Sequence, residues 1–324
     1  MIHERTQNLQ TLPEEEAGIK SALDALGYAA RCAGPTPQCC IRRDPDRCCP
    51  NFAVAIHSAL PQVRQRLDEV LMGDNPEHGL DALLEIGALN SILPEVQALV
   101  GFGDGEWLHK DVWKHTKQVV HQTERRLELR WAALLHDIGK PKTRSISPEG
   151  EVHFLGHAEL GARMFDRIDR RLRLFSHQPQ IKQSIRFLIL HHLRANQYEP
   201  NWTDSAVRRF AREIGGELDN LLCLSRADIT TKRPEKKRHG LQQLDELSAR
   251  IGELAKLDAI VPPLPSGIGN VIMETFGLPE SKLIGDIKRA LESAVDNGEI
   301  QGYQTCAFYI EFLNQNRERF QIPQ

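Results

Sequence analysis

Six side chains of metal-ligating types lie on, or at the end of, segments that the sequence predicts to be apolar helix faces. They are His115, His136, Asp137, His157, His192 and Asp228. A buried imidazole or carboxylate costs free energy unless it is paired. Neutral imidazoles and carboxylates that converge inside a helical bundle are the ligands that a divalent cation needs. We therefore predict a metal site, with His191 as the alternative to His192 because the two are adjacent.

Six ligands exceed the needs of one closed zinc site and suit one or two ions with open positions for water or substrate. A carboxylate that bridges two ions, here Asp137, holds them about 3.5 to 4 Å apart. Such a pair lowers the pKa of a bound water and clamps the oxygens of a phosphate ester. These ligand types are compatible with Mn, Fe, Ni, Co, Zn or Mg, and their pattern does not choose among these metals.

Each histidine also has a purely structural interpretation. A single histidine on an apolar face is more often a core residue that is hydrogen-bonded to a backbone carbonyl. A helical scaffold with such satisfied histidines would bind no metal, and a chelator would leave its stability unchanged. The joint pattern on five helices favours the metal site over this alternative.

The elements that must position these residues are predicted to be helices. Apolar residues recur at helical spacing from about residue 76 to residue 319, and no alternation of strands with helices is present. The stretch TRSISPEGEVHFLG predicts two short extended arms around a turn, so one β-hairpin is expected near 143–155. The fold class is therefore all-α.

Composition divides the chain into four expected parts. Residues 1–72 contain five of the seven cysteines, in adjacent pairs rather than at CxxC spacing. We predict a poorly ordered N-terminal extension there, with Met72 as a second possible start of the chain. A helical lead-in is expected at 73–110, the main domain at 111–258, and a helical C-terminal region at 259–324.

Several classes of protein are excluded or disfavoured. No apolar run approaches the ~18 residues that cross a bilayer, and the N-terminus lacks a signal peptide, so no membrane partner and a cytoplasmic location are expected. The sequence has no GxxxxGK[ST] or GxGxxG phosphate loop and no GxSxG elbow. The net charge is −3, but basic residues cluster at 167–173 and 231–240.

The order of the six residues resembles that of the HD superfamily of metal-dependent phosphohydrolases, and LLHDIGKP looks like its central motif. Residues from about 75 to 305 are similar to the HD-containing C-terminal half of bacterial CCA-adding tRNA nucleotidyltransferases. The stretches that carry this similarity are LLEIGALNSILPE, DVWKHTKQVV, LLHDIGKPKTR, GEVHFLGHAELGA and LSRADITTK. The Gly-Gly-Ser loop and paired carboxylates of the nucleotidyltransferase domain are not found in this sequence. We therefore do not expect CCA addition.

The resemblance implies an HD-type helical bundle and a role for each residue. It implies metal ligation by His115, His136, Asp137 and Asp228, and a second metal at His157 and His192. It also implies that Lys140 and Arg144 meet a substrate phosphate, and that Asp137 and Lys140 are catalytic.

The function that follows is a metal-dependent phosphohydrolase or phosphodiesterase. Its substrate would be a nucleotide, a cyclic nucleotide or a phosphate ester at an RNA end. The alternative is a module that binds tRNA or another nucleic acid, with a vestigial or structural metal site. The two basic clusters motivate this alternative, because Lys and Arg bind nucleic-acid phosphates.

Overall fold

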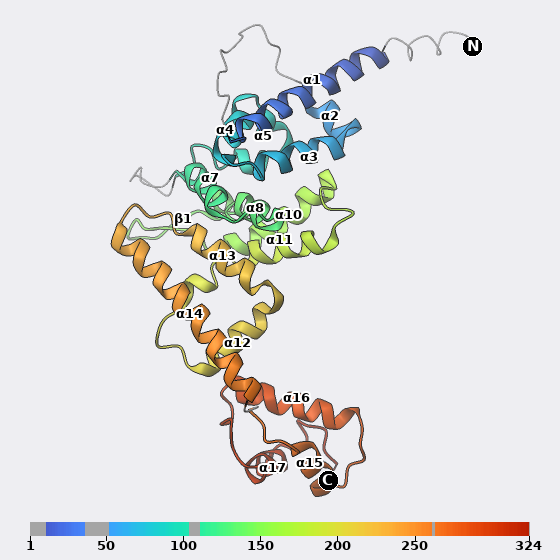
Figure 1. The fold of residues 1–324 in the computed structure, drawn as a ribbon, viewed down its shortest axis with the longest axis vertical. Helices are drawn as coiled ribbons and strands as arrows, with labels where there is room; N and C mark the ends of the chain where they lie inside the picture. The colour runs from blue at the N-terminus through green and yellow to red at the C-terminus, as the bar shows by residue number, and fades with distance from the viewer. Residues whose placement is uncertain (1–10, 36–51, 104–110, 261–262, 324) are drawn as a thin grey trace, which may run out of the picture. The chain divides into compact units, whose positions relative to one another are not determined.

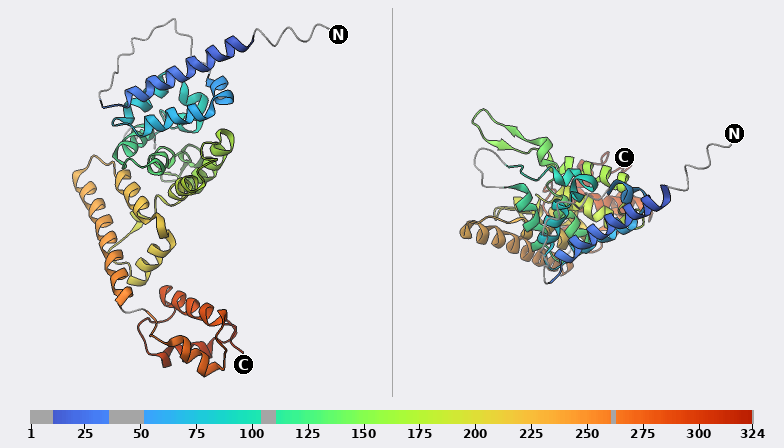
Figure 2. Two further views of the ribbon diagram at one scale, coloured as in Figure 1. Left: turned by 45° about the vertical axis from the view of Figure 1, so that its right-hand side comes forward. Right: turned by 90° about the horizontal axis from the view of Figure 1, so that it is seen from above.

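The computed structural model describes residues 11–35, 52–103, 111–260 and 263–323. In this part of the chain all elements are helical except one antiparallel hairpin, in which β1 (Ser145–Ile146) pairs with β2 (Val152–His153). The all-α fold and the hairpin near 143–155 are thereby confirmed. In the right-hand view of Figure 2 this hairpin projects from the helices around it. No described helix is long and apolar enough to span a membrane.

The chain forms two compact units, Met1–Asn196 with Asp219–Gly240, and Gln197–Leu218 with Leu241–Gln324. This division differs from the expected boundaries at 111–258 and 259–324. The reason is packing between segments far apart in the sequence. Helix α12 (Asp204–Ile214) contacts α16 (Lys282–Asp296). Residues 197–218 therefore belong to the second unit, although residues of the first unit precede and follow them in the chain.

The first unit holds the predicted site and is built mainly from helices (Figure 1). They are α1 (Thr11–Cys32), α2 (Phe52–Ser58), α3 (Leu60–Leu71), α4 (Pro76–Glu85), α5 (Ala88–Ile92), α6 (Pro94–Gln97), α7 (Val112–Gln122), α8 (Leu127–Leu135), α9 (Lys140–Thr143), α10 (His157–Leu172), α11 (Pro179–His191) and α13 (Leu218–Asp228), followed by the start of α14 (Pro234–Ile260).

The sequence predicts a poorly ordered N-terminal extension at 1–72, whereas the structure describes helices α1, α2 and α3 within residues 11–35 and 52–72. Helix α1 packs against α3 and α4. Apolar residues at helical spacing, mostly alanines, are fully buried along it and just past its end: Ala22, Leu26, Ala29 and Ala33. A Cβ on Gly73 would lie 2.4 Å from the carbonyl oxygen of Ala33, so this contact is backbone to backbone. The proline- and cysteine-rich stretch concealed this face in the sequence. Cys39, Cys40, Cys48 and Cys49 lie outside the described residues.

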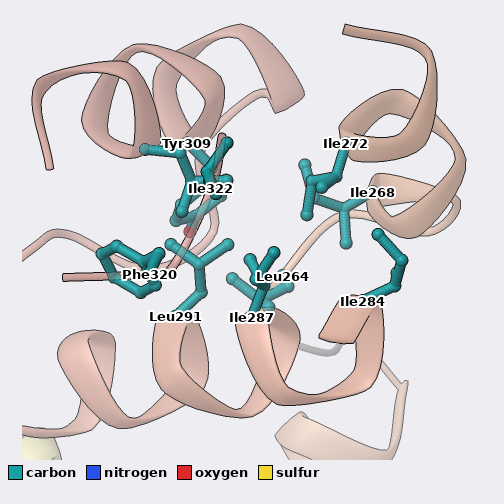
Figure 3. Close-up of a cluster of buried hydrophobic side chains, with 10 residues drawn as sticks. Leu264, Ile268, Ile272, Ile284, Ile287, Leu291, Tyr309, Phe320 and Ile322 are labelled. Carbon is teal, nitrogen blue, oxygen red and sulfur yellow. The ribbon is translucent and has the colours of Figure 1, made fainter. Parts of the chain in front are cut away.

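The second unit has its own core (Figure 3). Its helices are α12, the remainder of α14, α15 (Ile268–Phe276), α16 and α17 (Cys306–Gln315), with a short 3₁₀ turn at Gly215–Glu217. Another 3₁₀ turn, Ala195–Gln197, lies where the chain passes from the first unit to the second. The core consists of Leu264, Ile268, Ile272, Ile284, Ile287, Leu291, Tyr309, Leu313, Phe320 and Ile322. Helix α16 supplies Ile284, Ile287 and Leu291 at the i, i+3 and i+7 positions of one face.

A carboxylate network gives this second unit an expected pH dependence. Asp258 accepts hydrogen bonds from Arg208 at 2.8 and 2.9 Å and from the Tyr303 hydroxyl at 2.6 Å. Burial acts to raise the pKa of Asp258, but these hydrogen bonds outweigh it and hold the pKa below its ordinary value. The stabilisation is therefore present above about pH 4 and is lost as the pH falls through the lowered pKa.

We expect the Asp258→Asn variant to be less stable than wild type at neutral pH and to lose less stability than wild type on acidification. Urea unfolding of the full chain from pH 7 to pH 2.5 measures it, as the difference in free energy of unfolding between wild type and variant. The difference should shrink as the pH falls below about 4, because the protonated wild-type carboxyl no longer binds Arg208 as an anion. A difference that stays constant over this range would contradict the prediction.

Candidate metal centre

The centre begins where the buried helix α8 ends. Its residues from Leu129 to Leu135 are all buried, and His136 and Asp137 follow directly, at 1% and 0% exposure. The apolar run therefore carries two polar side chains into the interior of the first unit. Such burial is tolerated only when the polar groups find partners there.

The other four side chains arrive from four further helices, mostly at helix ends. His157 is the first residue of α10, His192 follows the last residue of α11, and Asp228 is the last residue of α13. His115 lies in the first turn of α7, whose N-cap residue Asp111 accepts a hydrogen bond from the Lys114 amide at 3.2 Å. Helix ends thus bring one ligand each to a common point.

A glycine of the LLHDIGKP motif permits the closest of these approaches. A Cβ on Gly139 would lie 2.2 Å from the carbonyl oxygen of His157, a separation that real Cβ atoms do not show. On the facing helix, a Cβ on Gly161 would meet Ile189 at 3.3 Å. The absence of side chains at these glycines lets the start of α10 lie against the backbone after Asp137, which places His157 beside that carboxylate.

Three imidazoles are oriented in the same way. Nδ1–H of His136, His157 and His192 donates to the carbonyl oxygen of the residue three positions earlier, at 2.7 to 2.8 Å. A carbonyl oxygen only accepts hydrogen bonds, so the hydrogen sits on Nδ1, and Nε2 of each neutral ring is a bare acceptor. In the fourth ring, Nδ1 of His115 lies 2.8 Å from the Thr230 hydroxyl oxygen.

The Nε2 atoms of these rings face one another. Nε2 of His157 lies 3.2 Å from Nε2 of His192, and Nε2 of His115 lies 3.2 Å from Nε2 of His136. Two acceptors at such a distance repel each other unless a positive charge lies between them. Burial lowers the pKa of His157, and it lowers the pKa of His192 to about 4, so a proton is a poor candidate for that charge between this pair.

Asp137 lies between the two histidine pairs and offers one oxygen to each. Its Oδ2 is 3.5 Å from His115 Nε2 and 3.2 Å from His136 Nε2, while its Oδ1 is 3.5 Å from His157 Nε2. Oδ1 is buried and makes no hydrogen bond with any described residue. Asp228 completes the first group, with Oδ1 at 3.1 Å from His115 Nε2. The ligand atoms therefore form two candidate groups, His115–His136–Asp228 and Asp137–His157–His192.

The two carboxyl groups remain ionised at neutral pH. Burial acts to raise the pKa of Asp137, but His136 and Lys140 beside it hold that pKa well below its usual range. Burial likewise opposes ionisation of Asp228, and the neighbouring His115 and His136 lower its pKa to about 2. Metal ligation requires ionised carboxylates and neutral imidazoles. The lowered pKa values of His157 and His192 meet this requirement. Burial acts to lower the pKa of His136, but Asp137 and Asp228 raise it, so a metal would displace a proton from this ring. The donor set therefore fits one or two divalent cations.

A pocket of about 350 Å³ opens beside the first group. It is lined by Val112, His115, Lys140, Phe154, Asp228, Ile229, Thr230 and Thr231. The Lys140 ammonium donates to Asp137 Oδ2 at 2.6 Å and lies 5.7 Å from the centre of the Phe154 ring. The lining therefore combines a cationic group with polar side chains, among them the Asp228 carboxylate, and with the apolar Val112, Phe154 and Ile229. With metal at the carboxylates, it would suit an anionic ligand that carries an apolar part.

The structure brings together all six predicted ligands and Lys140 but leaves two predicted residues apart. Arg144 is exposed at the end of α9 and does not line this pocket. His191 points its ring toward Phe187, with ring centres 4.3 Å apart, while His192 lies in the cluster. Sequence reasoning missed Thr230 and Phe154. The only available signal for Thr230 was its position two residues after Asp228 in LSRADITTK.

This arrangement belongs to a known class of domain. Residues 109–232 match the family model described as HD domain, so the chain contains an HD domain, and the predicted resemblance is confirmed.

Relatives cover more of the chain than this domain. The chain is similar to an A-adding tRNA nucleotidyltransferase from Deinococcus radiodurans, with 30% identity over 78% of this chain and 58% of the relative. It is also similar to a CC-adding tRNA nucleotidyltransferase from Thermus thermophilus, with 31% identity over 82% of this chain and 60% of the relative. A multifunctional CCA protein from Dechloromonas aromatica is 36% identical over 36% of this chain and 29% of the relative. The chain spans about three fifths of the length of the first two relatives.

Proposed function

We propose that the chain is a metal-dependent phosphohydrolase that cleaves phosphate esters of nucleotides, cyclic nucleotides or RNA ends. The observation that carries this proposal is the convergence of four imidazoles and two carboxylates, in which Nε2 of His157 and Nε2 of His192 face each other at 3.2 Å. A divalent cation would satisfy these acceptors together with the buried Oδ1 of Asp137, and an HD domain around them agrees with this chemistry. Divalent ions held there supply a nucleophilic water of lowered pKa and neutralise phosphoryl oxygens.

The roles of the residues follow from their positions. His115, His136 and Asp228 would hold one ion, His157 and His192 the other, and Asp137 both. The ammonium of Lys140 lies at the wall of the pocket beside Asp137, where it stabilises negative charge on a phosphate that reacts there. Phe154 and Val112 line the same pocket and reduce its water content, which strengthens that electrostatic interaction. Arg144, which is exposed, would meet substrate only outside the pocket.

The test is hydrolysis by the purified chain of a chromogenic phosphodiester, 2′,3′-cyclic nucleotides and mononucleotides. Each substrate is assayed with Mn²⁺, Ni²⁺, Mg²⁺ or a chelator. We expect turnover that depends on metal and differs among the substrates. A folded protein that binds divalent ions but cleaves none of these substrates would reject the hydrolase.

The second candidate function is binding of tRNA or another RNA. Exposed basic residues on α10 and at 232–238 favour it, and the relatives named above are tRNA nucleotidyltransferases. A binding module would retain RNA in the presence of chelator, whereas the hydrolase would lose turnover. Both activities together would indicate an enzyme that acts on RNA.

Substitution of Lys140 tests the stabilisation of phosphate charge separately from the binding of metal. We expect Lys140→Met to lower kcat by about a hundredfold, because it removes one preorganised positive charge from the reacting phosphate. The metal content should stay at the wild-type level, because none of the six ligands changes. Lys142→Met is the matched control, since Lys142 is exposed on the same short helix. A Lys140→Met variant with unchanged kcat would show that the ammonium does not contact the phosphate.

A further inference from the structure

A basic segment follows the pocket directly along the chain. Thr230 and Thr231 line the pocket, and Lys232, Arg233, Lys236, Lys237 and Arg238 come next. The amide of Arg233 donates to the hydroxyl of Thr231 at 3.3 Å, which fixes the start of the segment beside the pocket. All of these residues belong to the first unit.

Most of these charges have no counter-ion in the described chain. Arg238 pairs with Glu235, the one acidic residue of the segment. Lys232, Arg233 and Lys236 are exposed, and none of them forms an ion pair with a described residue. Three like charges within five residues repel one another, so their proximity is not explained by the stability of the fold.

Their position on the helix is also unfavourable. Helix α14 begins at Pro234, so Lys236 lies in its first turn and Arg233 immediately precedes it. The N-terminus of a helix carries a partial positive charge and favours acidic side chains. Basic residues at this end weaken the folded state slightly, and a sequence that breaks such a local rule usually does so for function. The helix end and the side chains together attract an anion.

The pocket itself limits what that anion can be. A mononucleotide has one terminal phosphate, and in the proposed hydrolase this phosphate lies at the metal ligands and Lys140. It then has no further phosphate to offer Lys232, Arg233 and Lys236. A polynucleotide that enters by its end has such phosphates, one for each additional nucleotide.

We propose that Lys232, Arg233 and Lys236 bind the phosphate backbone of a single-stranded polynucleotide whose terminal phosphate ester enters the pocket. This inference rests on the proposed hydrolase function for the pocket, but the binding surface is measurable without turnover. The three residues touch none of the six ligands in any described contact, so their substitution leaves the metal groups intact.

The experiment compares two substrates on the full chain. One is an RNA of about ten nucleotides that ends in a phosphate ester, and the other is the corresponding mononucleotide. We expect the triple variant Lys232→Ala, Arg233→Ala, Lys236→Ala to lower kcat/KM for the oligomer by about 30-fold, about threefold for each lost contact. The value for the mononucleotide should change by less than about twofold. Equal effects on both substrates would overturn the proposal.

A matched control uses exposed basic residues of the same unit that lie outside both basic clusters. The variant Lys20→Ala, Arg31→Ala, Lys142→Ala removes the same number of exposed charges. It should leave kcat/KM for the oligomer within about threefold of wild type. If this control lost as much as the triple variant, net charge rather than the segment beside the pocket would explain binding.

Binding of a fluorescent oligomer, followed by anisotropy in chelator, separates the two proposals. The triple variant should bind more weakly than wild type, and the slope of log K against log salt should fall in magnitude by about 2, because each phosphate contact on a single strand contributes about 0.7. This outcome supports the surface even if no substrate is cleaved. Unchanged binding and an unchanged slope overturn it, whatever the hydrolysis assay shows.

Discussion

The Asp137→Asn variant is expected to lose phosphate-ester hydrolysis by at least about a thousandfold while it keeps its fold. The substitution preserves the shape of the side chain but removes the charge that both ligand groups share. A neutral amide is a poor bridge between two cations. Metal-ion catalysis stabilises the transition state by several kcal/mol, and each loss of about 1.4 kcal/mol lowers the rate about tenfold. The metal bound per chain, measured by plasma mass spectrometry after dialysis, should fall with the activity.

Asp24→Asn is the control for this variant. Asp24 is exposed on α1 and forms no described ion pair, so the same chemical change there should leave metal content and kcat at wild-type values. Circular dichroism in chelator should give the same helical signal for both variants and wild type. Full metal content together with wild-type kcat in Asp137→Asn would show that the carboxylate is not a ligand.

The second large effect is expected from the smallest change in the site. Gly139→Ala adds one methyl group, whose carbon would lie 2.2 Å from the carbonyl oxygen of His157. Neither group is the end of a flexible side chain, so the start of α10 must move away from Asp137. We expect a loss of about 2 to 3 kcal/mol in the free energy of unfolding, as for an overpacked core. His157 moves with its helix, so affinity for metal should decrease as well.

The same substitution elsewhere in the chain should have the opposite sign. Gly252 lies inside helix α14, and a Cβ built on it meets nothing within 4 Å. Gly252→Ala is expected to stabilise the protein by about 0.5 to 1 kcal/mol, because alanine has the higher helix propensity. Urea unfolding of both variants checks the pair. A Gly139→Ala variant as stable as wild type would mean that the contact with His157 is not tight in solution.

Much of the centre could be predicted because the positions of its side chains depend on short-range sequence patterns. A histidine or aspartate on an apolar helix face is visible as a break in the periodicity, and five such breaks predicted the six side chains that the structure brings together. The preference for His192 over His191 came from the same source, since three apolar residues on α11, Ile185, Leu188 and Ile189, share its face. Their roles as ligands stay predictions that the variants above test.

The features that the sequence did not reveal depend on contacts at long range. The apolar face of α1 consists mainly of alanines, which carry little hydrophobic signal. It can be identified as a packing surface only from its contacts with Gly73 and α4. The assignment of α12 to the second unit depends on packing against α16, some 80 residues further on. Thr230 lies in a polar stretch, so the sequence does not distinguish it from its neighbours. Only the structure places its hydroxyl beside His115.

The recurring bond from Nδ1–H to the carbonyl three residues earlier has a consequence for how the centre is assembled. Each of these three rings is aimed by its own stretch of backbone, so its orientation is established when that stretch folds. The rotational freedom of the rings is then lost during folding and not during ligation. We therefore expect the three rings to offer incoming ions a cage of fixed spacing. Such a cage would discriminate among ions by their size and would exchange them without rearranging the helices around it.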